Sequence, residues 1–455
     1  MNISVNRLSF SKVDYKILPP EELIEEGIVR LPISKSVLNR RLLLTSLTPG
    51  GVLSAPKGEE CVDIIVMRSA LDALASTKSS DVVEINVGES ATALRFLTAV
   101  CASRTKCETV ITGLPGLLRR PVGELVDVLR RCGAKIQYIG EKGFAPLSIV
   151  GCKLEGGEVN IDATISSQFI SALMMVAPLM SKGLKINFDG EPASLPYIKM
   201  TAEMMRRRGA DVTLYPTGVT IAEGGYTLVE DDDEADWSAA AFWYEVVALT
   251  AGWVTLRGES APMRDPSSSL QGDSAAASFF ERLGVLTGEP EDEDGNPTGE
   301  EGIALSPYPE IFGRLDLDLN DNPDLAPALT VTCCMLGVPF HFVGLKALSI
   351  KETDRLQALV EEMDKVGCCV EKIRDFGLEW DGKRHPLTEI PVLDSRGDHR
   401  LAMAFAPIAA YVPGIVVKNA GCVSKSYPAY WQSLRSLGFQ TLDPSAEVEK
   451  EEGNE

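Results

Sequence analysis

The sequence predicts a mixed α/β protein with two similar domains, each built from three βαβ-type units. Three observations support this fold class. The chain has 455 residues, which is too long for one ordinary hydrophobic core. Predicted strands alternate with predicted helices throughout the chain. A pattern of amphipathic helix, glycine and short strand also recurs at near-equal spacing, which is typical of repeated structural units.

The recurring pattern is clearest at 124–139 and 200–215, which read ELVDVLRRCGAKIQYI and MTAEMMRRRGADVTLY. A glycine directly after a helix can adopt the left-handed conformation that ends helices without steric cost. Successive glycines are 76, 75, 83 and 71 residues apart; they are Gly133, Gly209, Gly284, Gly367 and Gly438. A weaker copy at 67–76 would make six units, three in each domain. The alternative is a non-repeating α/β protein, because helix–glycine–strand segments are common in that class.

Acidic residues are concentrated in segments that we interpret as loops. The run EDDDEAD at 230–236 lies near mid-chain and is predicted to be a loop or hinge. The segment 288–302 is acidic and rich in glycine and proline, which indicates an exposed insertion. We expect the C-terminal 447–455 to be disordered.

Composition excludes several classes of partner. The net charge of −21 argues against nucleic acid and anionic membranes, so a local cluster of cations would indicate a specific anion site. The chain has no run of about 18 apolar residues, and its start lacks the pattern of a signal peptide, so we expect a cytoplasmic protein. Ten cysteines without a C-x-x-C pair and only three histidines predict reduced thiols and no metal site.

In the N-terminal half, small or cationic residues open several predicted apolar helices. A helix N-terminus favours anions, because its free N–H groups and its dipole both present positive charge. Each case alone also fits a capped helix with solvated charges. The residues concerned are Ser34, Lys35, Ser36 and Arg40, the segment 87–100, Arg119 and Arg120 before Pro121, and Ser166, Ser167 and Gln168.

The C-terminal half places charged residues at the starts of predicted buried helices. Such charges are costly unless they are paired or used in function, and structural salt bridges are the alternative explanation. The residues are Asp324, the group Lys351, Glu352, Asp354 and Arg355, the group Asp398, His399 and Arg400, and Lys425.

Seven motifs occur in one order along the chain. They are LPISKSVLNR, RPVGELVDVLRRCGA, SSQFISALM, SLPYI, KETDR, DHRLAM and SKSYP. With these motifs the chain resembles the 5-enolpyruvylshikimate-3-phosphate synthase family across nearly its full length. The resemblance implies an inside-out α/β barrel in each domain, with an active cleft between the domains that closes on substrate. It implies one domain from 1–31 and 236–455, mainly on the phosphoenolpyruvate side, and an inserted domain, 32–235, mainly on the shikimate 3-phosphate side.

The resemblance also implies a reaction, namely transfer of the enolpyruvyl group of phosphoenolpyruvate to the 5-hydroxyl of shikimate 3-phosphate. It implies a monomer without a metal or organic cofactor. Binding of shikimate 3-phosphate is assigned to Lys35, Ser36, Arg40, Ser166, Ser167, Gln168, Ser194, Tyr197, Asp324 and Lys351. Binding of phosphoenolpyruvate is assigned to Lys35, Ala91, Arg120, Gln168, Arg355, Arg400 and Lys425. Asp324 is the expected base, Glu352 or Lys35 the expected acid, and His399 and Thr92 support these groups.

The chain departs from the family pattern in the loop 88–95. Ala91 replaces the usual glycine, which should narrow the phosphoenolpyruvate pocket and weaken inhibition by the longer molecule glyphosate. Glu89 replaces the usual asparagine, and a carboxylate near a bound phosphate is repulsive. The alternatives are therefore a non-catalytic phosphometabolite-binding homologue, the related UDP-N-acetylglucosamine enolpyruvyl transferase, and a structural repeat protein without a site.

Overall fold

The computed structural model describes residues 2–3, 12–77, 82–104, 108–230, 233–291, 296–299 and 301–444. The chain divides into two compact units, each described here by itself. Unit 1 contains β1 (Asn2–Ile3) and residues from Lys35 to 230, and unit 2 contains the described residues up to Ser34 and from Asp233 onward. The predicted boundaries were 31/32 and 235/236. Residues 32–34 stay with unit 2 because Ile33 bridges Ala235 and the Ser34 N–H donates to the Glu234 carbonyl.

The first strand lies in a different unit from the one predicted. We expected all of 1–31 to belong with the C-terminal half, but β1 pairs in parallel with β4 of unit 1. The acidic run 230–236 also differs from a solvated loop. Glu234 is buried and accepts hydrogen bonds from Ser269, Leu270 and Gln271. Residues 231–232 of that run and the predicted disordered tail 447–455 lie outside the described residues.

Five sheets share one strand arrangement, in which a parallel pair is followed by two antiparallel strands. In unit 1 the sheets are β4 (Val82–Asn86), β5 (Glu108–Thr112), β7 (Leu147–Val150) and β6 (Lys135–Tyr138), with β1 at the edge, and then β8 (Gly157–Asp162), β9 (Leu184–Asp189), β11 (Gly218–Ile221) and β10 (Val212–Tyr215). The shared arrangement is physical evidence for the predicted repeat.

Unit 2 contains the other three sheets. They are β3 (Gly27–Leu31), β12 (Val254–Gly258), β14 (Ile303–Ile311) and β13 (Leu283–Gly288); then β15 (Leu315–Asp318), β16 (Phe340–Val343), β18 (Gly377–Trp380) and β17 (Glu371–Ile373); and finally β19 (Val392–Asp394), β20 (Val416–Lys418), β2 (Tyr15–Leu18) and β21 (Gln440–Leu442). The last sheet is completed from the start of the chain, because β2 occupies the place that a strand after β21 would take. The first sheet is interrupted, because unit 1 lies between β3 and its parallel partner β12.

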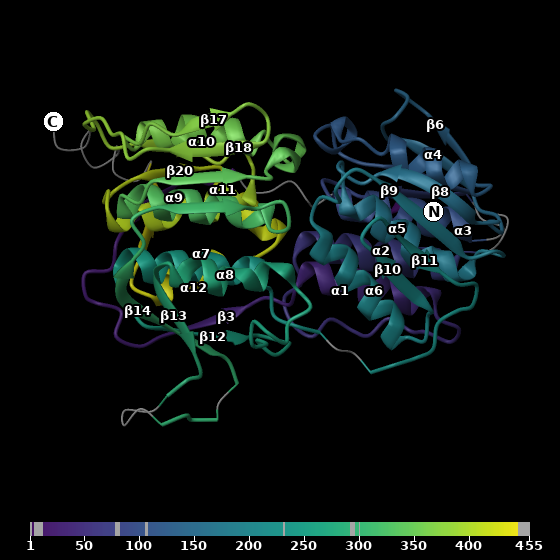
Figure 1. Ribbon diagram of the computed structural model, residues 1–455, viewed down its shortest axis with the longest axis horizontal. Helices are drawn as coiled ribbons and strands as arrows, with labels where there is room; N and C mark the ends of the chain where they lie inside the picture. Colours follow the sequence, from purple (N-terminus) through teal and green to yellow (C-terminus); the bar gives the residue numbers. More distant parts are fainter. Residues whose placement is uncertain are drawn as a thin grey trace. The chain divides into compact units, whose positions relative to one another are not determined.

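Each unit has a core of helices that pack on one another, namely α1 (Lys35–Leu47), α3 (Ala91–Ser103) and α5 (Ser167–Val176) in unit 1, and α7 (Trp237–Thr250), α9 (Ala326–Leu336) and α11 (His399–Phe405) in unit 2. These helices are buried because they are apolar on nearly every side. Figure 1 shows α9 and α11 side by side with α7 beneath them. The remaining helices are α2 (Val62–Ser76), α4 (Gly123–Arg131), α6 (Leu195–Arg207), α8 (Ala276–Glu281), α10 (Arg355–Lys365) and α12 (Tyr430–Ser436).

The predicted fold class is confirmed: the protein is mixed α/β, with helices inside and sheets around them. The five glycines predicted to end helices all have positive φ, between 83° and 99°. In the described residues no helix is both long and apolar enough to cross a membrane.

One buried charge in the core of unit 2 should make stability depend on pH. Glu245 is fully buried in α7, and neither of its carboxyl oxygens has a hydrogen-bond partner among the described residues. Burial raises the pKa of Glu245 well above its ordinary value. The folded state therefore keeps a proton that the unfolded state loses, so stability falls as pH rises above the unfolded pKa.

We expect Glu245→Gln to resemble the parent protein near pH 5 and to become increasingly more stable than it above that pH. The difference should grow by about 1.4 kcal/mol per pH unit until the folded pKa is reached. Urea unfolding at several pH values measures this difference. Glu281→Gln, on the exposed side of α8, is the control. Parallel pH profiles for Glu245→Gln and the parent protein would contradict the prediction.

Candidate functional site

The candidate residues lie at the N-terminal ends of the core helices, where side chains cap free N–H groups. In unit 1 the Ser90 hydroxyl accepts from the Ala93 N–H at the start of α3, and the Ser166 hydroxyl accepts from the Gln168 N–H at the start of α5. In unit 2, Asp236 and Asp398 cap α7 and α11 in the same way. The repeat therefore places one helix N-terminus per unit at a position where polar side chains gather.

Arg40 is the most informative cation of unit 1, because its side chain is buried among neutral partners. Its Nε donates to the Thr201 hydroxyl over 2.6 Å, and its other nitrogens donate to the Ser36 carbonyl, the Ser171 hydroxyl and the Tyr197 carbonyl. No carboxylate is among the hydrogen-bond partners that the described part of the chain supplies. Burial lowers the pKa of Arg40 to about 10. A buried guanidinium that lacks a countercharge favours an incoming anion.

A second cluster in unit 1 joins α3 and α5 around Gln168. The Gln168 amide donates to the Thr92 hydroxyl over 3.1 Å, and its carbonyl accepts from Arg95 over 2.6 Å. Arg95 also donates to the Ser166 hydroxyl and to the carbonyl of Pro121, which follows Arg120. The structure thus brings Thr92, Ser166 and Gln168 together, with the Arg120–Pro121 turn beside them.

Ser194 and Tyr197 lie at the start of α6, beside the Arg40 cluster. Ser194 is buried and has φ 57° and ψ 51°, a left-handed conformation that is uncommon for residues other than glycine. Its carbonyl accepts from the Tyr197 N–H, and the Tyr197 ring lies under the Arg40 guanidinium, 5.7 Å from ring centroid to Cζ. Ser167, the first residue of α5, is buried as well. Strain of this kind often marks a functional position.

Lys35 begins α1 and is paired with Asp63 on α2. The Lys35 Nζ lies 3.0 Å from the Asp63 Oδ2, and both side chains are largely buried. Glu89, the unusual carboxylate of loop 88–95, packs against Gly116 so closely that a Cβ there would lie 2.8 Å from its Oε2. Ala91 is buried at the first position of α3. Glu89 is therefore directed toward loop 113–121.

In unit 2 the predicted residues form one network of ion pairs around Asp324. Its Oδ1 lies 2.9 Å from the Arg355 Nη1 and 3.5 Å from the Lys351 Nζ, and its Oδ2 lies 3.1 Å from the Arg400 Nη2. Glu352 pairs with Lys425 over 2.6 Å and with Arg355 over 3.0 Å. Two acids and four cations from distant parts of the sequence therefore meet in unit 2.

Arg355 is held rigidly beneath this network. Its side chain is 2% exposed, and its Nε and Nη2 donate to the two oxygens of the fully buried Asp398 over 2.7 and 3.2 Å. Asp398 also caps α11 by accepting from the Arg400 N–H. His399 is buried next to it, with Nδ1 4.0 Å from Asp398 Oδ1. Asp398 thus positions both arginines.

Two buried carboxyls of unit 2 have shifted pKa values in opposite directions. Burial alone would raise the pKa of Asp324, but the charges of Arg400, Lys351 and Arg355 outweigh it and hold that pKa well below its ordinary value. Burial raises the pKa of Asp273 to about 6, and the Asp324 charge adds to the effect. The Ser238 hydroxyl donates to Asp273 Oδ2. Neighbouring acids whose pKa values are pushed apart are typical of sites that move protons.

Four residues near the candidates were missed as site residues from the sequence. Asp398 and Arg95 lie inside recognised motifs, so the signal was present. Asp63 and Asp273 carried no sequence signal of their own, because their partners Lys35 and Ser238 lie 28 and 35 residues away.

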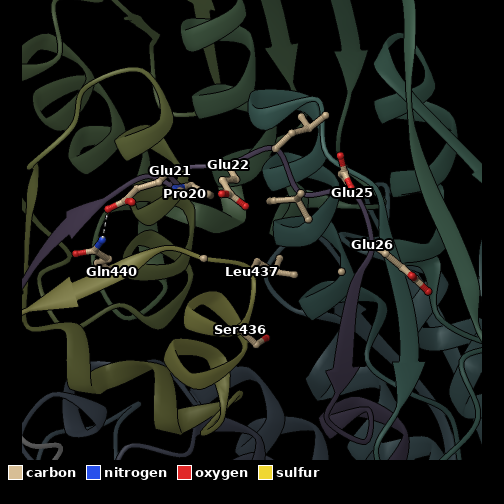
Figure 2. Close-up of a pocket in the computed structure, with 12 residues that line it drawn as sticks. Pro20, Glu21, Glu22, Glu25, Glu26, Ser436, Leu437 and Gln440 are labelled. Atoms are coloured by element: carbon tan, nitrogen blue, oxygen red, sulfur yellow. Dashed lines mark hydrogen bonds between the residues drawn. The ribbon is translucent and has the colours of Figure 1, made fainter.

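A separate cavity of unit 2 is unsuited to anions. It has a volume of about 470 Å³ and is lined by Pro20–Gly27, Ser436–Gly438 and Gln440. Figure 2 shows Glu21, Glu22, Glu25 and Glu26 around it, with Glu21 hydrogen-bonded to Gln440. Four carboxylates without a lining lysine or arginine would repel a negatively charged substrate.

Comparison with known proteins gives one consistent family. The model of the family described as EPSP synthase (3-phosphoshikimate 1-carboxyvinyltransferase) matches residues 23–434. A Bacteroides fragilis protein named 3-phosphoshikimate 1-carboxyvinyltransferase is 40% identical over 428 residues, covering 93% of this chain and 98% of its own length. A protein of the same name from Vibrio atlanticus is 32% identical over 441 residues, covering 91% of this chain and 97% of its own length.

Solved structures share the fold. EPSP synthase from Acinetobacter baumannii superposes with a TM-score of 0.70 at 22% identity, over 94% of this chain and 100% of that one. The enolpyruvyl transferase NikO from Streptomyces tendae superposes with a TM-score of 0.66 at 16% identity, over 95% of this chain and 99% of that one.

Proposed function

The chain belongs to the EPSP synthase family, and on that premise we propose that it transfers the enolpyruvyl group of phosphoenolpyruvate to the 5-hydroxyl of shikimate 3-phosphate. Phosphate is released, and the product feeds aromatic biosynthesis through the shikimate pathway. The match of the family model to residues 23–434 is the observation that carries this function. The alternatives, a UDP-N-acetylglucosamine enolpyruvyl transferase and a non-catalytic homologue, are not favoured, because the similar curated proteins carry the name of the shikimate enzyme.

Unit 1 is proposed to bind mainly shikimate 3-phosphate. The buried Arg40, with Ser36, would hold the carboxylate of that substrate, because guanidinium and carboxylate match in shape and charge. The phosphate would bind to Ser166, Ser167 and Ser194, next to Tyr197, and Gln168 would lie against the ring. These neutral donors at helix starts suit a phosphate. The support is the Arg40 geometry, in which every printed partner is neutral.

Unit 2 is proposed to bind mainly phosphoenolpyruvate. Its carboxylate would bind to Arg355 and Arg400, and its phosphate to Lys425 together with Lys35, Ala91 and Arg120 of unit 1. Lys351 would contact shikimate 3-phosphate through the 5-hydroxyl that Asp324 deprotonates. The support is the network of four cations around Asp324 and Glu352.

The proposed reaction is an addition followed by an elimination. Asp324 takes the proton of the 5-hydroxyl, whose oxygen forms a bond to C2 of phosphoenolpyruvate, while Glu352 or Lys35 gives a proton to C3. The tetrahedral intermediate then loses that C3 proton and the phosphate, which leaves the enol ether. Each proton transfer by a placed group is typically worth about 100- to 10,000-fold in rate. Holding both substrates in register adds further acceleration.

The location and assembly of the protein are part of the proposal. The nine described cysteines are free thiols, which suits the reducing cytoplasm. We propose that the protein acts there as a monomer, since each candidate cluster is formed within one chain. Gel filtration with light scattering at assay concentrations measures the assembly state.

Phosphate release tests the function directly. Purified protein is incubated with phosphoenolpyruvate, with and without shikimate 3-phosphate, and inorganic phosphate is measured. Release that requires shikimate 3-phosphate is the expected result. Binding of both substrates without release would instead support a non-catalytic homologue and direct attention to Glu89.

Arg40→Lys should raise the KM for shikimate 3-phosphate about 10- to 100-fold, with a smaller change in kcat. Lysine keeps the charge but loses the planar fork that fits a carboxylate. Arg41→Lys is the matched control, because Arg41 is also buried in α1 and donates to Ser54. Similar KM values for the two variants would argue against the role of Arg40. Steady-state kinetics with each substrate varied in turn supplies the measurement.

A further inference from the structure

Unit 2 contains a second group of reactive side chains, away from the Asp324 network. Asp364, Cys369 and His385 each offer a ligand atom, and these atoms all lie within 4.8 Å of one another. Asp364 is in the last turn of α10, and Arg355 begins that same helix. Eleven residues of helix span roughly 16 Å, so the group is at the opposite end from the Asp324 network.

The backbone holds the three residues together before any ligand is present. Two chain segments pair through a bridge between Cys368 and Arg384. The Cys369 N–H donates to the Lys383 carbonyl over 3.1 Å, and the His385 N–H donates to the Gly367 carbonyl over 2.9 Å. The approach is so close that a Cβ at Gly367 would lie 2.6 Å from the His385 carbonyl oxygen. The Gly367 N–H also donates to the Asp364 carbonyl, which fixes the segment to the end of α10.

The spacing of two of the ligand atoms suits a tetrahedral metal ion. Zinc binds histidine nitrogen and carboxylate oxygen at about 2.0–2.2 Å, so two such ligands at a tetrahedral angle lie about 3.3–3.4 Å apart. The His385 Nε2 lies 3.3 Å from the Asp364 Oδ1. A thiolate bound at about 2.3 Å would lie roughly 3.6 Å from each of these atoms. The Cys369 Sγ therefore needs to move by little more than 1 Å, roughly the shift that a small side-chain rotation gives.

The other nitrogen of His385 supports the same assignment. Its Nδ1 lies 3.2 Å from the Pro386 carbonyl oxygen. A histidine that binds a metal through one nitrogen usually donates its other N–H to a carbonyl or carboxylate, which fixes the tautomer and orients the ring. Donation from Nδ1 to Pro386 leaves the Nε2 lone pair directed toward Asp364.

We propose that Asp364, Cys369 and His385 form a binding site for a divalent transition-metal ion of the zinc type. A thiolate, an imidazole and a carboxylate together favour zinc over magnesium or calcium, which prefer all-oxygen sites. Water would fill the fourth position, because Asp364 and His385 are exposed. The ion would link the end of α10 to the paired segments 367–369 and 383–385, so its role is structural. This site departs from the expectation, based on cysteine and histidine spacing, that the chain has no metal site.

Cobalt(II) titration of the untagged, reduced full-length protein tests the site, because cobalt reports a thiolate ligand by charge-transfer absorption in the near ultraviolet. We expect one equivalent to bind with that absorption. Cys369→Ser should abolish it, and His385→Gln and Asp364→Asn should each weaken zinc binding at least about tenfold in competition with a chromogenic chelator. Cys152→Ser, which removes a partly buried thiol of unit 1, is the matched control and should bind as the parent does.

Thermal unfolding gives a second measurement. Zinc should raise the midpoint of the parent and of Cys152→Ser, but not that of Cys369→Ser. Absence of the charge-transfer band would overturn the proposal, as would a band that persists in Cys369→Ser. Zinc binding that is unchanged in both His385→Gln and Asp364→Asn would also overturn it. Because Cys369 is outside the proposed active site, transferase activity without added metal should be equal in Cys369→Ser and the parent.

Discussion

Asp324→Asn should lower kcat about 100- to 10,000-fold, because it removes the proposed base while keeping the shape of the side chain. The KM for phosphoenolpyruvate should not rise, since Arg400 and Lys351 lose a competing carboxylate and become more available to the substrate. Asp316→Asn, which removes an exposed partner of Arg314 in the same unit, is the control. A variant that keeps more than about a tenth of the parent kcat would exclude Asp324 as the base.

The pH dependence of the reaction should show how Asp324 becomes basic enough to act. Three cations hold the pKa of Asp324 well below its ordinary value, and a carboxylate in that state accepts protons poorly. When Arg355 and Arg400 bind the substrate carboxylate, part of their charge is neutralised, so the pKa of Asp324 should rise. The acid limb of kcat should therefore lie at higher pH than that of kcat/KM, after correction for ionisation of the free substrates. Coincident limbs would mean that substrate does not activate the base.

Arg355→Met should destabilise the protein by about 3–5 kcal/mol, which is the typical cost of leaving a buried partner charge uncompensated. Asp398 is fully buried and receives two hydrogen bonds from Arg355, so the substitution leaves that carboxylate without its main cation. Activity should fall with stability, because Arg355 also contacts Asp324 and Glu352. Urea unfolding measures the stability change.

Two further variants separate the charge effect from a general loss of packing. Arg314→Met removes an exposed ion pair and should change stability by less than about 0.5 kcal/mol. The double variant Arg355→Met, Asp398→Asn should recover part of the loss, because it removes the carboxylate that the single variant leaves unpaired. If the double variant is as unstable as the sum of both single variants, the pair is not coupled as the structure indicates.

The repeat could be predicted from sequence because it is a local pattern. Helix amphipathicity and a following glycine are both encoded within about fifteen residues, and the positive φ of Gly133 and Gly209 follows from that local signal. The unit 2 network was found through intact motifs such as KETDR and DHRLAM, although its partners are far apart in the chain. Arg355 and Asp398, for example, are separated by 43 residues.

Long-range packing decided the features that sequence analysis missed. Nothing local distinguishes Asp63 as the partner of Lys35, or Asp273 as a buried acid beside Asp324. The acidic run 230–236 was predicted to be a loop because charge usually indicates solvent. Its Glu234 is buried instead, because Ser269, Leu270 and Gln271 supply the hydrogen bonds that water would otherwise provide.

The interruption between β3 and β12 has a consequence for the order in which the chain folds during synthesis. Strand β3 leaves the ribosome roughly 220 residues before its partner β12, and at 5–20 residues per second that delay is on the order of 10–45 s. All of unit 1 is made in that interval, whereas β2 must wait still longer for β20 and β21. Unit 1 can therefore complete its core while the first strands of unit 2 remain unpaired, and these waiting strands are the segments that chaperones would have to protect.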